Sequence, residues 1–444
     1  MLTQQSLDEI QGNILVPFTK RNQCFLFFSF RLPSAKPREW LRELDGLGII
    51  ASTRDVFGGE KPVLGALGLT ASGLVRLRPE FAEELVPYGA FWQGALADRM
   101  TEDGRAVLPS AALVGDLAAS GPTPVNWVVG GLGPPVDAIL TLAADEDLEA
   151  VVDKVQGLAE KNDLTTLWRQ AGRRLLDEDQ NPIEHFGFRD GISQPSVQGF
   201  PPGAPFDESR IAPGEFVLGY EGEPGRDHEQ DPPELMVNGS FQVFLRLNQD
   251  VGGWRAQMAD LQASAATPID VAAKVIGRAA NGDPLANGGP GGPLNDFTYQ
   301  GDPRGKRTPR FAHIRKVYPR SDAPDNGASH RMLRRGTTFG PPFDEGVDAE
   351  RGLLFNGFVA SIEHQFEFVM RNWASSADSL PAEVGDADGP DPLIGTAVPR
   401  CTLHQANRAD VDIEFGQFVR TTAAVYAFAP SMSALRRLGA PDPT

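Results

Sequence analysis

The sequence predicts an α+β fold made of two similar halves, each an antiparallel β-sheet with helices on one face. In the first half, a dense aromatic run at 25–32 is followed by a polar break and by helical spacing of apolar residues at 40–47. The second half repeats this order, with an alternating strand at 241–247 and a helical pattern at 254–261. Strands and helices do not alternate strictly, which disfavours a doubly wound parallel sheet.

Further strand candidates complete each half. They are residues 62–77, 125–129 and 139–143 in the first half, and residues 353–362 and 419–428 in the second. Pro, Gly and acidic residues are frequent at 200–234, which indicates a linker or a long loop. We therefore expect an N-terminal domain at 1–200 and a C-terminal domain at 201–444.

Composition narrows the class of protein. The chain has 444 residues, with 41 Lys and Arg against 59 Asp and Glu, so its formal net charge is −18. The hydrophobic fraction of 41% and the charged fraction of 23% are typical of a globular protein and exclude overall disorder. The negative charge argues against nucleic acid and against anionic membranes as partners, because both require clustered Lys and Arg.

The first residues lack the pattern of a secretion signal, since the first basic residue is Lys20 and no apolar core follows a basic segment. No stretch approaches the ~18–20 apolar residues of a membrane span. We expect a cytoplasmic protein. The two cysteines, Cys24 and Cys401, exclude a disulfide framework and a Cys-rich zinc site.

A loop at 277–310 is unusually rich in Gly and Pro, and His313 follows it directly. Loops of this length are mobile or surround a functional site. His313 has apolar neighbours and several basic residues nearby, which suits a ligand to the iron of a porphyrin whose propionates also need cations. On these residues alone, a structural histidine beside a solvated basic patch remains the alternative. His330 and His185 are the rival ligands.

Two further segments carry candidate functional groups. Gly187 and Gly191 bracket Asp190, and glycine lets the backbone approach a flat ligand closely, so this carboxylate would be aimed into a cavity. An ordinary Asp-Gly turn is the alternative. Arg334 and Arg335 form a guanidinium pair between apolar residues and a glycine.

The sequence resembles the dye-decolorizing (DyP-type) haem peroxidases, and in particular their larger C/D-type members. Residues 187–191, Gly-Phe-Arg-Asp-Gly, match the Gly-x-x-Asp-Gly signature of that family. Other segments resemble the family in order along the chain. They are residues 11–15, 25–28, 313–316, 334–340, 351–355, 365–373 and 391–395.

This resemblance implies two ferredoxin-like halves, with haem b (iron protoporphyrin IX) between the sheet and the helices of the second half. His313 would be the proximal iron ligand. Asp391 would accept a hydrogen bond from its other ring nitrogen, which makes the imidazole a stronger ligand. Asp386 and Asp388 are the alternatives for this carboxylate.

On the opposite haem face, the resemblance implies that Asp190 moves a proton between the two oxygens of hydrogen peroxide, while Arg334 stabilises the developing negative charge. Leu353 and Phe355 match positions in the apolar distal wall. Arg315 and Arg335 are candidates for pairing with the propionates or for supporting the site, with a surface role as the alternative.

The implied function is a haem peroxidase that reduces hydrogen peroxide and oxidises dyes, phenols or other one-electron donors. Phe339 stands where some relatives carry a tyrosine, which argues against efficient oxidation of large dyes. Tyr318 and Trp373 are candidate electron relays. A haem-handling protein with incidental peroxidase activity and a non-haem α+β binding protein are the alternatives. The sequence predicts no oligomeric state.

Overall fold

A computed structural model describes most of the chain. The described residues are 2–31, 34–59, 61–96, 99–100, 106–108, 127–200, 206–224, 232–264, 270–378, 388–395, 399–406 and 409–442.

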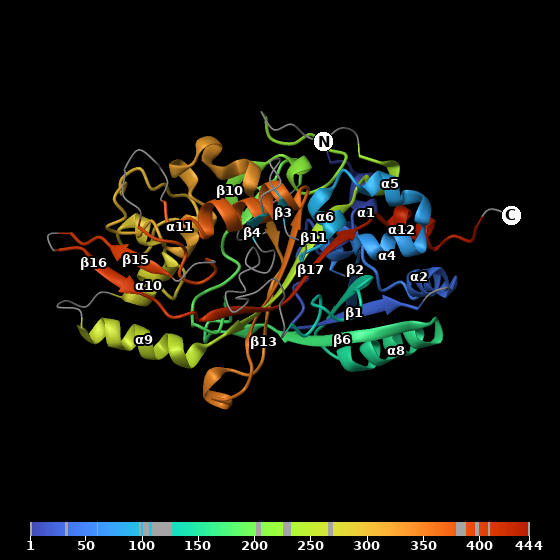
Figure 1. Ribbon diagram of the computed structural model, residues 1–444, viewed down its shortest axis with the longest axis horizontal. Helices are drawn as coiled ribbons and strands as arrows, with labels where there is room; N and C mark the ends of the chain where they lie inside the picture. Colours follow the sequence, from blue (N-terminus) through green and yellow to red (C-terminus); the bar gives the residue numbers. More distant parts are fainter. Residues whose placement is uncertain are drawn as a thin grey trace.

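The centre of the fold is a 9-stranded antiparallel sheet with the order β12-β14-β11-β17-β2-β5-β1-β6, in which β13 pairs with β14 (Figure 1). Its strands are β1 (Asn22–Phe30), β2 (Val63–Leu69), β5 (Ala138–Ala144), β6 (Leu164–Arg173), β11 (Ser240–Gln249), β12 (Leu333–Arg334), β13 (Thr337–Phe339), β14 (Gly352–Val359) and β17 (Val419–Ala429).

Four two-stranded sheets lie outside this sheet, and β9 with β10 is the parallel pair among them. Their strands are β3 (Arg99–Met100), β4 (Ala106–Leu108), β7 (Leu175–Leu176), β8 (Pro182–Ile183), β9 (Gln194–Val197), β10 (Phe206–Ile211), β15 (Arg400–Leu403) and β16 (Val411–Glu414).

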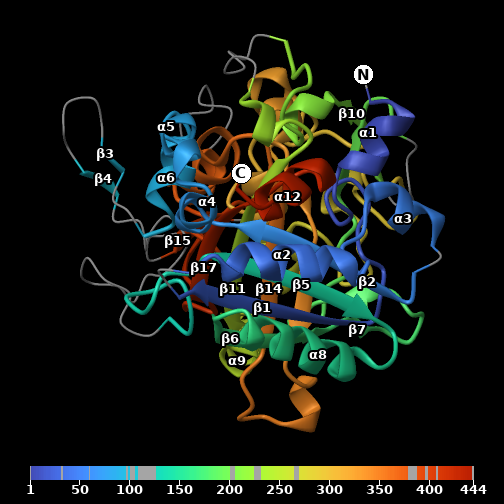
Figure 2. The same cartoon turned by 90° about the vertical axis from the view of Figure 1, so that its right-hand side faces the viewer.

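Helices cover the sheet, and α2 packs beside both α8 and α12 at the first half (Figure 2). The α-helices are α1 (Gln4–Glu9), α2 (Lys36–Gly46), α3 (Thr53–Gly58), α4 (Ala71–Leu77), α5 (Ala82–Leu85), α6 (Gly89–Gln93), α8 (Leu148–Lys161), α9 (Val251–Ser264), α10 (Val271–Ile276), α11 (His313–Val317) and α12 (Met432–Gly439). The 3₁₀ turns are η1 (Pro79–Phe81), η2 (Pro213–Glu215), η3 (Glu234–Met236), η4 (Leu285–Asn287), η5 (Arg320–Asp322), η6 (Pro324–His330) and η7 (Phe343–Glu345), and the π-helices are η8 (Ile362–Glu367) and η9 (Val369–Ala374).

The α+β class with an antiparallel sheet is confirmed. Strands predicted before residue 200 form one side of the sheet and those after it form the other, and the two sides meet where Phe428 of β17 pairs with Leu69 of β2. The domain boundary at 200/201 stays a prediction.

Three predicted strands need correction. The segment at 353–362 is a strand only as far as Val359, and Ile362 already begins a π-helix. The segment at 62–77 is a strand only as far as Leu69, because Thr70 then caps helix α4: its hydroxyl accepts a hydrogen bond from the backbone N–H of Gly73 at 3.1 Å. Of the segment at 125–129, the first two residues lie outside the described residues. The rest forms no strand, and Val129 makes only an isolated bridge to Ala423.

The sheet curls so that strands far apart in its order face each other. The ring centroids of Phe25 and Phe27 on β1 lie 5.1 and 5.0 Å from that of Phe244 on β11, although three strands separate β1 from β11 in the sheet. The hydroxyl of Thr338 on β13 also donates to the carbonyl of Arg173, the last residue of β6, and accepts from the backbone N–H of Leu175. An aromatic core therefore fills the inside of the curl.

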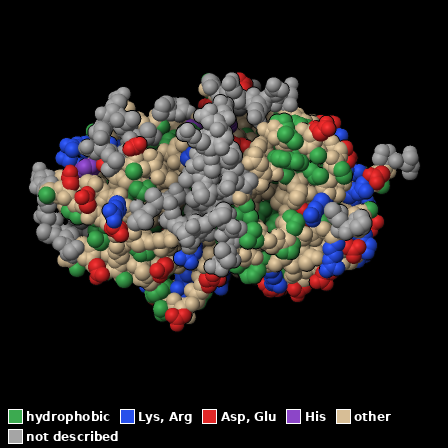
Figure 3. Space-filling model, in the orientation of Figure 1, with side chains coloured by type: hydrophobic (Ala, Val, Ile, Leu, Met, Phe, Trp, Pro, Cys, Tyr) green, Lys and Arg blue, Asp and Glu red, His purple; other side chains and the backbone are tan. Residues whose placement is uncertain are grey.

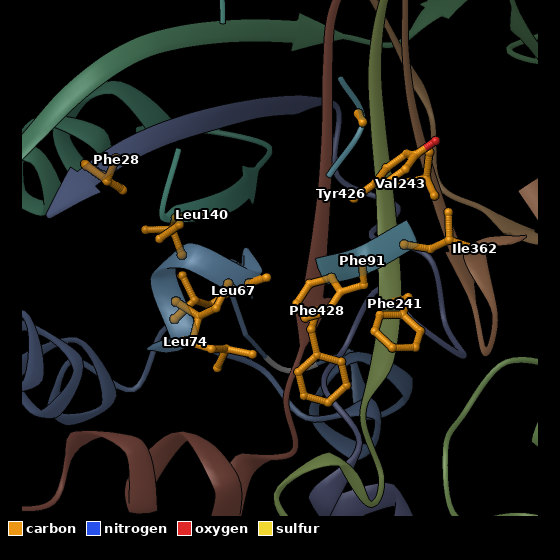
Figure 4. Packing of buried hydrophobic residues seen from close by; sticks show 14 of the residues in the cluster. Phe28, Leu67, Leu74, Phe91, Leu140, Phe241, Val243, Ile362, Tyr426 and Phe428 are labelled. Atoms are coloured by element: carbon orange, nitrogen blue, oxygen red, sulfur yellow. The ribbon is translucent and has the colours of Figure 1, made fainter. Parts of the chain in front are cut away.

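A second, larger apolar cluster packs the outer face of the sheet against the helices. Figure 4 shows Phe28, Leu67, Leu74 and Leu140 on one side of this cluster and aromatic rings, including Phe241, on the other. Trp40 of α2 is fully buried there, with its ring centroid 5.5 Å from that of Phe28. The helical spacing at 40–47 thus marks the buried face of α2.

Acidic and basic side chains are interspersed over the face of the molecule shown in Figure 3. Among the described residues, no helix combines the length and the apolar character that crossing a bilayer requires.

Because Phe244 joins the two sides of the curled sheet, we expect Phe244→Ala to lower the free energy of unfolding by about 3–5 kcal/mol. Urea denaturation followed by circular dichroism measures this change. The control is Val411→Ala, because Val411 is 42% exposed and its truncation leaves no buried cavity. Equal effects of the two substitutions would contradict a core between the two sides.

Candidate active site

A cavity of about 280 Å³ lies in the second half of the molecule. Strands β11, β14 and β17 form one wall, and the π-helical segment opposite supplies Phe366, Val369 and Met370. The segment at 184–193 and helix α11 complete the enclosure. The cavity is therefore bounded by a sheet and by helices, and most of its lining is apolar.

The π-helical segment is built to present a wide face to this cavity. Gln365 anchors it: its side chain accepts from the backbone N–H of Ser361 at 2.9 Å and donates to the carbonyls of Glu215 and Arg331 at 2.8 and 2.6 Å. π-helices are rare and occur mostly at functional sites.

His313 is the first residue of α11, and it lines the cavity. Its Nδ1 donates to Oδ2 of Asp391 at 2.8 Å, while 30% of its side chain stays exposed. Burial alone would lower the pKa of His313, but the charge of Asp391 and the hydrogen bond to it outweigh burial and raise that pKa. Because Nδ1 is engaged, Nε2 is the ring nitrogen available to a ligand.

Asp391 is fully buried and satisfied. Its Oδ1 accepts from the backbone N–H groups of Leu393 at 2.8 Å and Ile394 at 3.3 Å, so the carboxylate is fixed from both sides. Of the two alternatives for this role, Asp388 binds Arg310 and His404 instead, and Asp386 lies outside the described residues.

Asp190 and Arg334 also line the cavity. Asp190 accepts from the backbone N–H of Gly191 at 2.7 Å, and Gly191 has a positive φ of 72°, which glycine adopts without strain. The guanidinium of Arg334 donates to the carbonyl of Ser193, and its backbone N–H donates to Gln194 at 3.0 Å. The structure therefore brings the predicted carboxylate and guanidinium to the cavity that His313 enters.

Leu353 and Phe355 point from β14 into the same cavity, where Phe355 lies beside Phe366 with ring centroids 6.0 Å apart. The alternation of a strand explains their shared face, since side chains two residues apart point to the same side.

Arg315 and Arg335 do not line the cavity, so a supporting role remains for them in place of direct pairing with a propionate, and that role stays a prediction. Arg315 is buried beneath α11 and donates to Asp322 at 2.7 Å and to the Thr308 carbonyl at 2.7 Å. Arg335 follows the last residue of β12 and donates to carbonyls of the N-terminal segment, including that of Ile14 at 2.7 Å. Burial and the nearby Arg334 lower the pKa of Arg335 to about 9.

Four other arginines line the cavity in their place, namely Arg189, Arg278, Arg320 and Arg331. The guanidinium carbon of Arg331 lies 3.8 Å from the ring centroid of Tyr318, and that of Arg320 lies 4.4 Å from it. Sequence reasoning noted Arg320 only as part of a basic patch. Its position in the basic segment that follows His313 is the indication that the sequence offers.

The rival histidines have other partners. His330 lines the cavity, but its ring stacks on Phe368 with centroids 3.8 Å apart, and its Nδ1 donates to the His364 carbonyl at 2.5 Å. His185 is buried outside the cavity lining and contacts the Phe339 carbonyl at 2.8 Å. His313 differs from both in the hydrogen bond of its Nδ1 to the buried Asp391.

The aromatic residues considered for electron transfer are all largely buried. Phe339 lies beneath Arg246, whose guanidinium carbon is 4.3 Å from the ring centroid. Tyr318 lines the cavity, and Trp373 packs edge-on against His330 with centroids 4.9 Å apart.

Glu184 is a cavity residue that sequence reasoning missed. Its carboxylate accepts from the backbone N–H groups of Phe186 and Phe188 at 2.9 Å and from Gln249 at 2.7 Å. Burial, assisted by the charge of Asp190, nevertheless raises the pKa of Glu184 to about 7. The residue therefore fixes the turn that leads to Asp190 and titrates near neutral pH.

Comparison with known proteins shows what the chain is similar to. A model of the C-terminal part of DyP-type peroxidases matches residues 227–383. Peroxidase 2 of Mycetinis scorodonius is 28% identical over 97% of this chain and 87% of its own length. The multifunctional dye peroxidase DyP2 of an Amycolatopsis species is 29% identical over 97% of this chain and 96% of its own length.

Among solved structures, a dye-decolorizing peroxidase in complex with 2,6-dimethoxyphenol has a TM-score of 0.81 and 25% identity, with 98% of this chain and 99% of that chain covered. A deferrochelatase of Yersinia pestis matches a smaller part, with 25% identity over 52% of this chain and 47% of its own length. The relatives and the solved structures support a peroxidase function for this fold. The chain is similar to dye-decolorizing, or DyP-type, peroxidases over nearly its whole length.

Because Glu184 binds a proton more tightly in the folded chain than in the unfolded one, we expect the stability of the cofactor-free protein to fall as pH rises from about 4.5 to about 7. Glu184→Gln should remove this part of the slope. Urea unfolding across that pH range measures it. The control is Glu149→Gln, at a side chain that is 72% exposed. A slope that persists unchanged in Glu184→Gln would contradict the assignment.

Proposed function

We propose that the protein is a haem b peroxidase in which His313 holds the iron and Asp190 and Arg334 activate hydrogen peroxide on the other side. One observation carries this proposal: an imidazole oriented by a buried carboxylate shares a cavity with a carboxylate and a guanidinium drawn from distant segments.

The residues present fit a haem. His313 has one ring nitrogen held by Asp391, which leaves a basic nitrogen for iron. The apolar walls suit a porphyrin, and Arg320 and Arg331, held against Tyr318, are suitable partners for its two propionates. When bound, the haem supplies the two-electron chemistry that splits the oxygen–oxygen bond of the peroxide.

Asp190 serves as the proton carrier in this proposal. Its carboxylate, held on one oxygen by the Gly191 N–H, takes the proton from one oxygen of hydrogen peroxide and delivers it to the other, which leaves as water. Arg334 is fixed by Ser193 and Gln194, so its positive charge stands ready to stabilise the negative charge that develops during this cleavage.

Leu353 and Phe355 restrict the space available beside these two groups, so the peroxide is a small one. We propose phenols and similar one-electron donors as reducing substrates, in line with the solved relative that binds 2,6-dimethoxyphenol. Large dyes would have to be oxidised from outside the cavity. Phe339, which is 3% exposed and not readily oxidised, offers no such relay.

Release of iron from haem is the second candidate, on the partial match to a deferrochelatase. The distal pair of Asp190 and Arg334 favours peroxide chemistry over it. The cytoplasmic location predicted from the sequence stays a prediction.

We expect Asp190→Asn to slow the reaction of the ferric enzyme with hydrogen peroxide by about 10²–10⁴-fold and Arg334→Leu to slow it by about 10²–10³-fold. Stopped-flow absorbance of the haem measures this rate. The control is Arg400→Leu, whose side chain is 80% exposed and pairs with Glu414. Peroxide reactivity that survives both cavity substitutions would point to haem handling instead.

We also expect His313→Ala to weaken haem binding by at least about tenfold and to change the ferric absorption spectrum, because the iron loses its imidazole. His330→Ala is the matched control, since His330 lines the same cavity but donates to a carbonyl. Haem titration of both variants measures the difference. The reverse outcome would assign the iron to His330.

A further inference from the structure

The chain segments that carry His313 and Asp391 are joined a second time, by a buried ion pair. Arg310 donates from Nε to Oδ2 of Asp388 at 2.6 Å and from Nη2 to Oδ1 at 2.8 Å, and both side chains are 1% exposed. Arg310 precedes His313 by as many residues as Asp388 precedes Asp391, so each contact joins residues 78 positions apart. The Arg310–Asp388 and His313–Asp391 contacts therefore lie side by side and join the same two segments.

His404 is the third member of this buried network. Its Nε2 lies 3.0 Å from Oδ1 of Asp388, and its Nδ1 lies 2.9 Å from Oδ2 of Asp410. An ionised carboxylate only accepts hydrogen bonds, so both contacts require a proton on each ring nitrogen. His404 is therefore an imidazolium when both hydrogen bonds are made, and with Arg310 it compensates the charge of Asp388.

The backbone between Asp388 and Asp391 transmits this anchoring. The Asp388 carbonyl accepts from Thr402 at 3.0 Å, and the thiol of Cys401 lies 3.3 Å from the Pro390 carbonyl. Gly389 has a φ of 104°, and a Cβ there would lie 2.3 Å from the Arg400 carbonyl oxygen. Strand β15, which ends one residue before His404, thus packs tightly against the turn at 388–391 and fixes its position.

We propose that His404 is a positioning residue: by holding Asp388 together with Arg310, it fixes the turn that places Asp391 on His313 and so sets the strength of the iron–histidine bond. This inference rests on His313 being the iron ligand. It also explains why Asp388 does not take this role: Asp388 is committed to Arg310 and His404, whereas Asp391 bonds His313.

The same geometry makes the proximal side sensitive to pH. Burial would lower the pKa of His404, but the hydrogen bonds to Asp410 and Asp388 outweigh burial and raise that pKa above its ordinary value. The charged groups that face this site are Asp388 and Asp410, with Arg310 across Asp388 and Arg304 near Asp410. The doubly bonded state holds below the pKa of His404 and is lost as pH rises through it.

The test is resonance Raman spectroscopy of the ferrous holoenzyme, which reports the iron–histidine stretching frequency, across a pH series. In the wild type we expect this frequency to fall as pH rises past the pKa of His404. Asp410→Asn should move the midpoint to lower pH, and because Asp410 is 45% exposed this variant is expected to fold. His404→Phe should give the low frequency at every pH and weaken haem binding by roughly tenfold.

Two variants separate the outcomes. Asp412→Asn is the matched control on the same hairpin, where its exposed carboxylate accepts from Thr402, and it should leave frequency and midpoint unchanged. Asp391→Asn should lower the frequency at all pH values, and if it does not, the proposed roles of His313 and Asp391 are wrong. If Asp391→Asn lowers the frequency while His404→Phe and Asp410→Asn behave as the wild type, the role of His404 is overturned and the proposed function stands.

Discussion

The hydrogen bond from His313 to Asp391 is the interaction on which the site depends. It joins two segments 78 residues apart, fixes the ring tautomer and turns the second nitrogen toward the cavity. A buried carboxylate is costly unless it is paired and hydrogen-bonded, and Asp391 meets this condition with the imidazole and two backbone N–H groups. The surrounding network of Arg310, Asp388 and His404 meets the same condition. Each of its buried charges is paired with an opposite one, and this pairing fixes the backbone.

The fold was predictable where the pattern is local. Dense or alternating apolar residues predict the strands in the segments 25–32 and 241–247, because each strand must cover a core on at least one face. The strand predicted at 62–77 was wrong beyond Leu69. A continuous apolar run does not distinguish the period of a strand from that of a helix, and a single capping threonine decides where the helix begins. The curl that sets β1 against β11 depends on contacts between distant residues, which no local pattern contains.

The site was predictable where one short motif carries one role. His313, Asp190 and Arg334 lie on separate motifs, and the structure brings all three to one cavity. Sequence alone did not show that Arg315 and Arg335 face away from the cavity, because adjacency in sequence says nothing of side-chain direction: Ile314 and Arg334 line the cavity, while their neighbours Arg315 and Arg335 bond buried partners. No sequence pattern indicated that Glu184 belongs to the site, because its role comes from hydrogen bonds that its carboxylate accepts from backbone N–H groups two and four residues away.

The lining of the cavity is rich in positive charge, in contrast to the acidic chain as a whole. The chain as a whole carries −18, yet five arginines line this one space. Guanidinium groups tolerate such a place better than ammonium groups, since they are weakly hydrated, stack on aromatic rings and donate in several directions at once. Arg320 uses all of these means, with its guanidinium against Phe297 and Tyr318 and a 2.7 Å bond to the Asn295 carbonyl. Because carbonyl oxygens and ring faces leave its formal charge in place, Arg320 suits an anionic partner, in line with the propionate pairing proposed above.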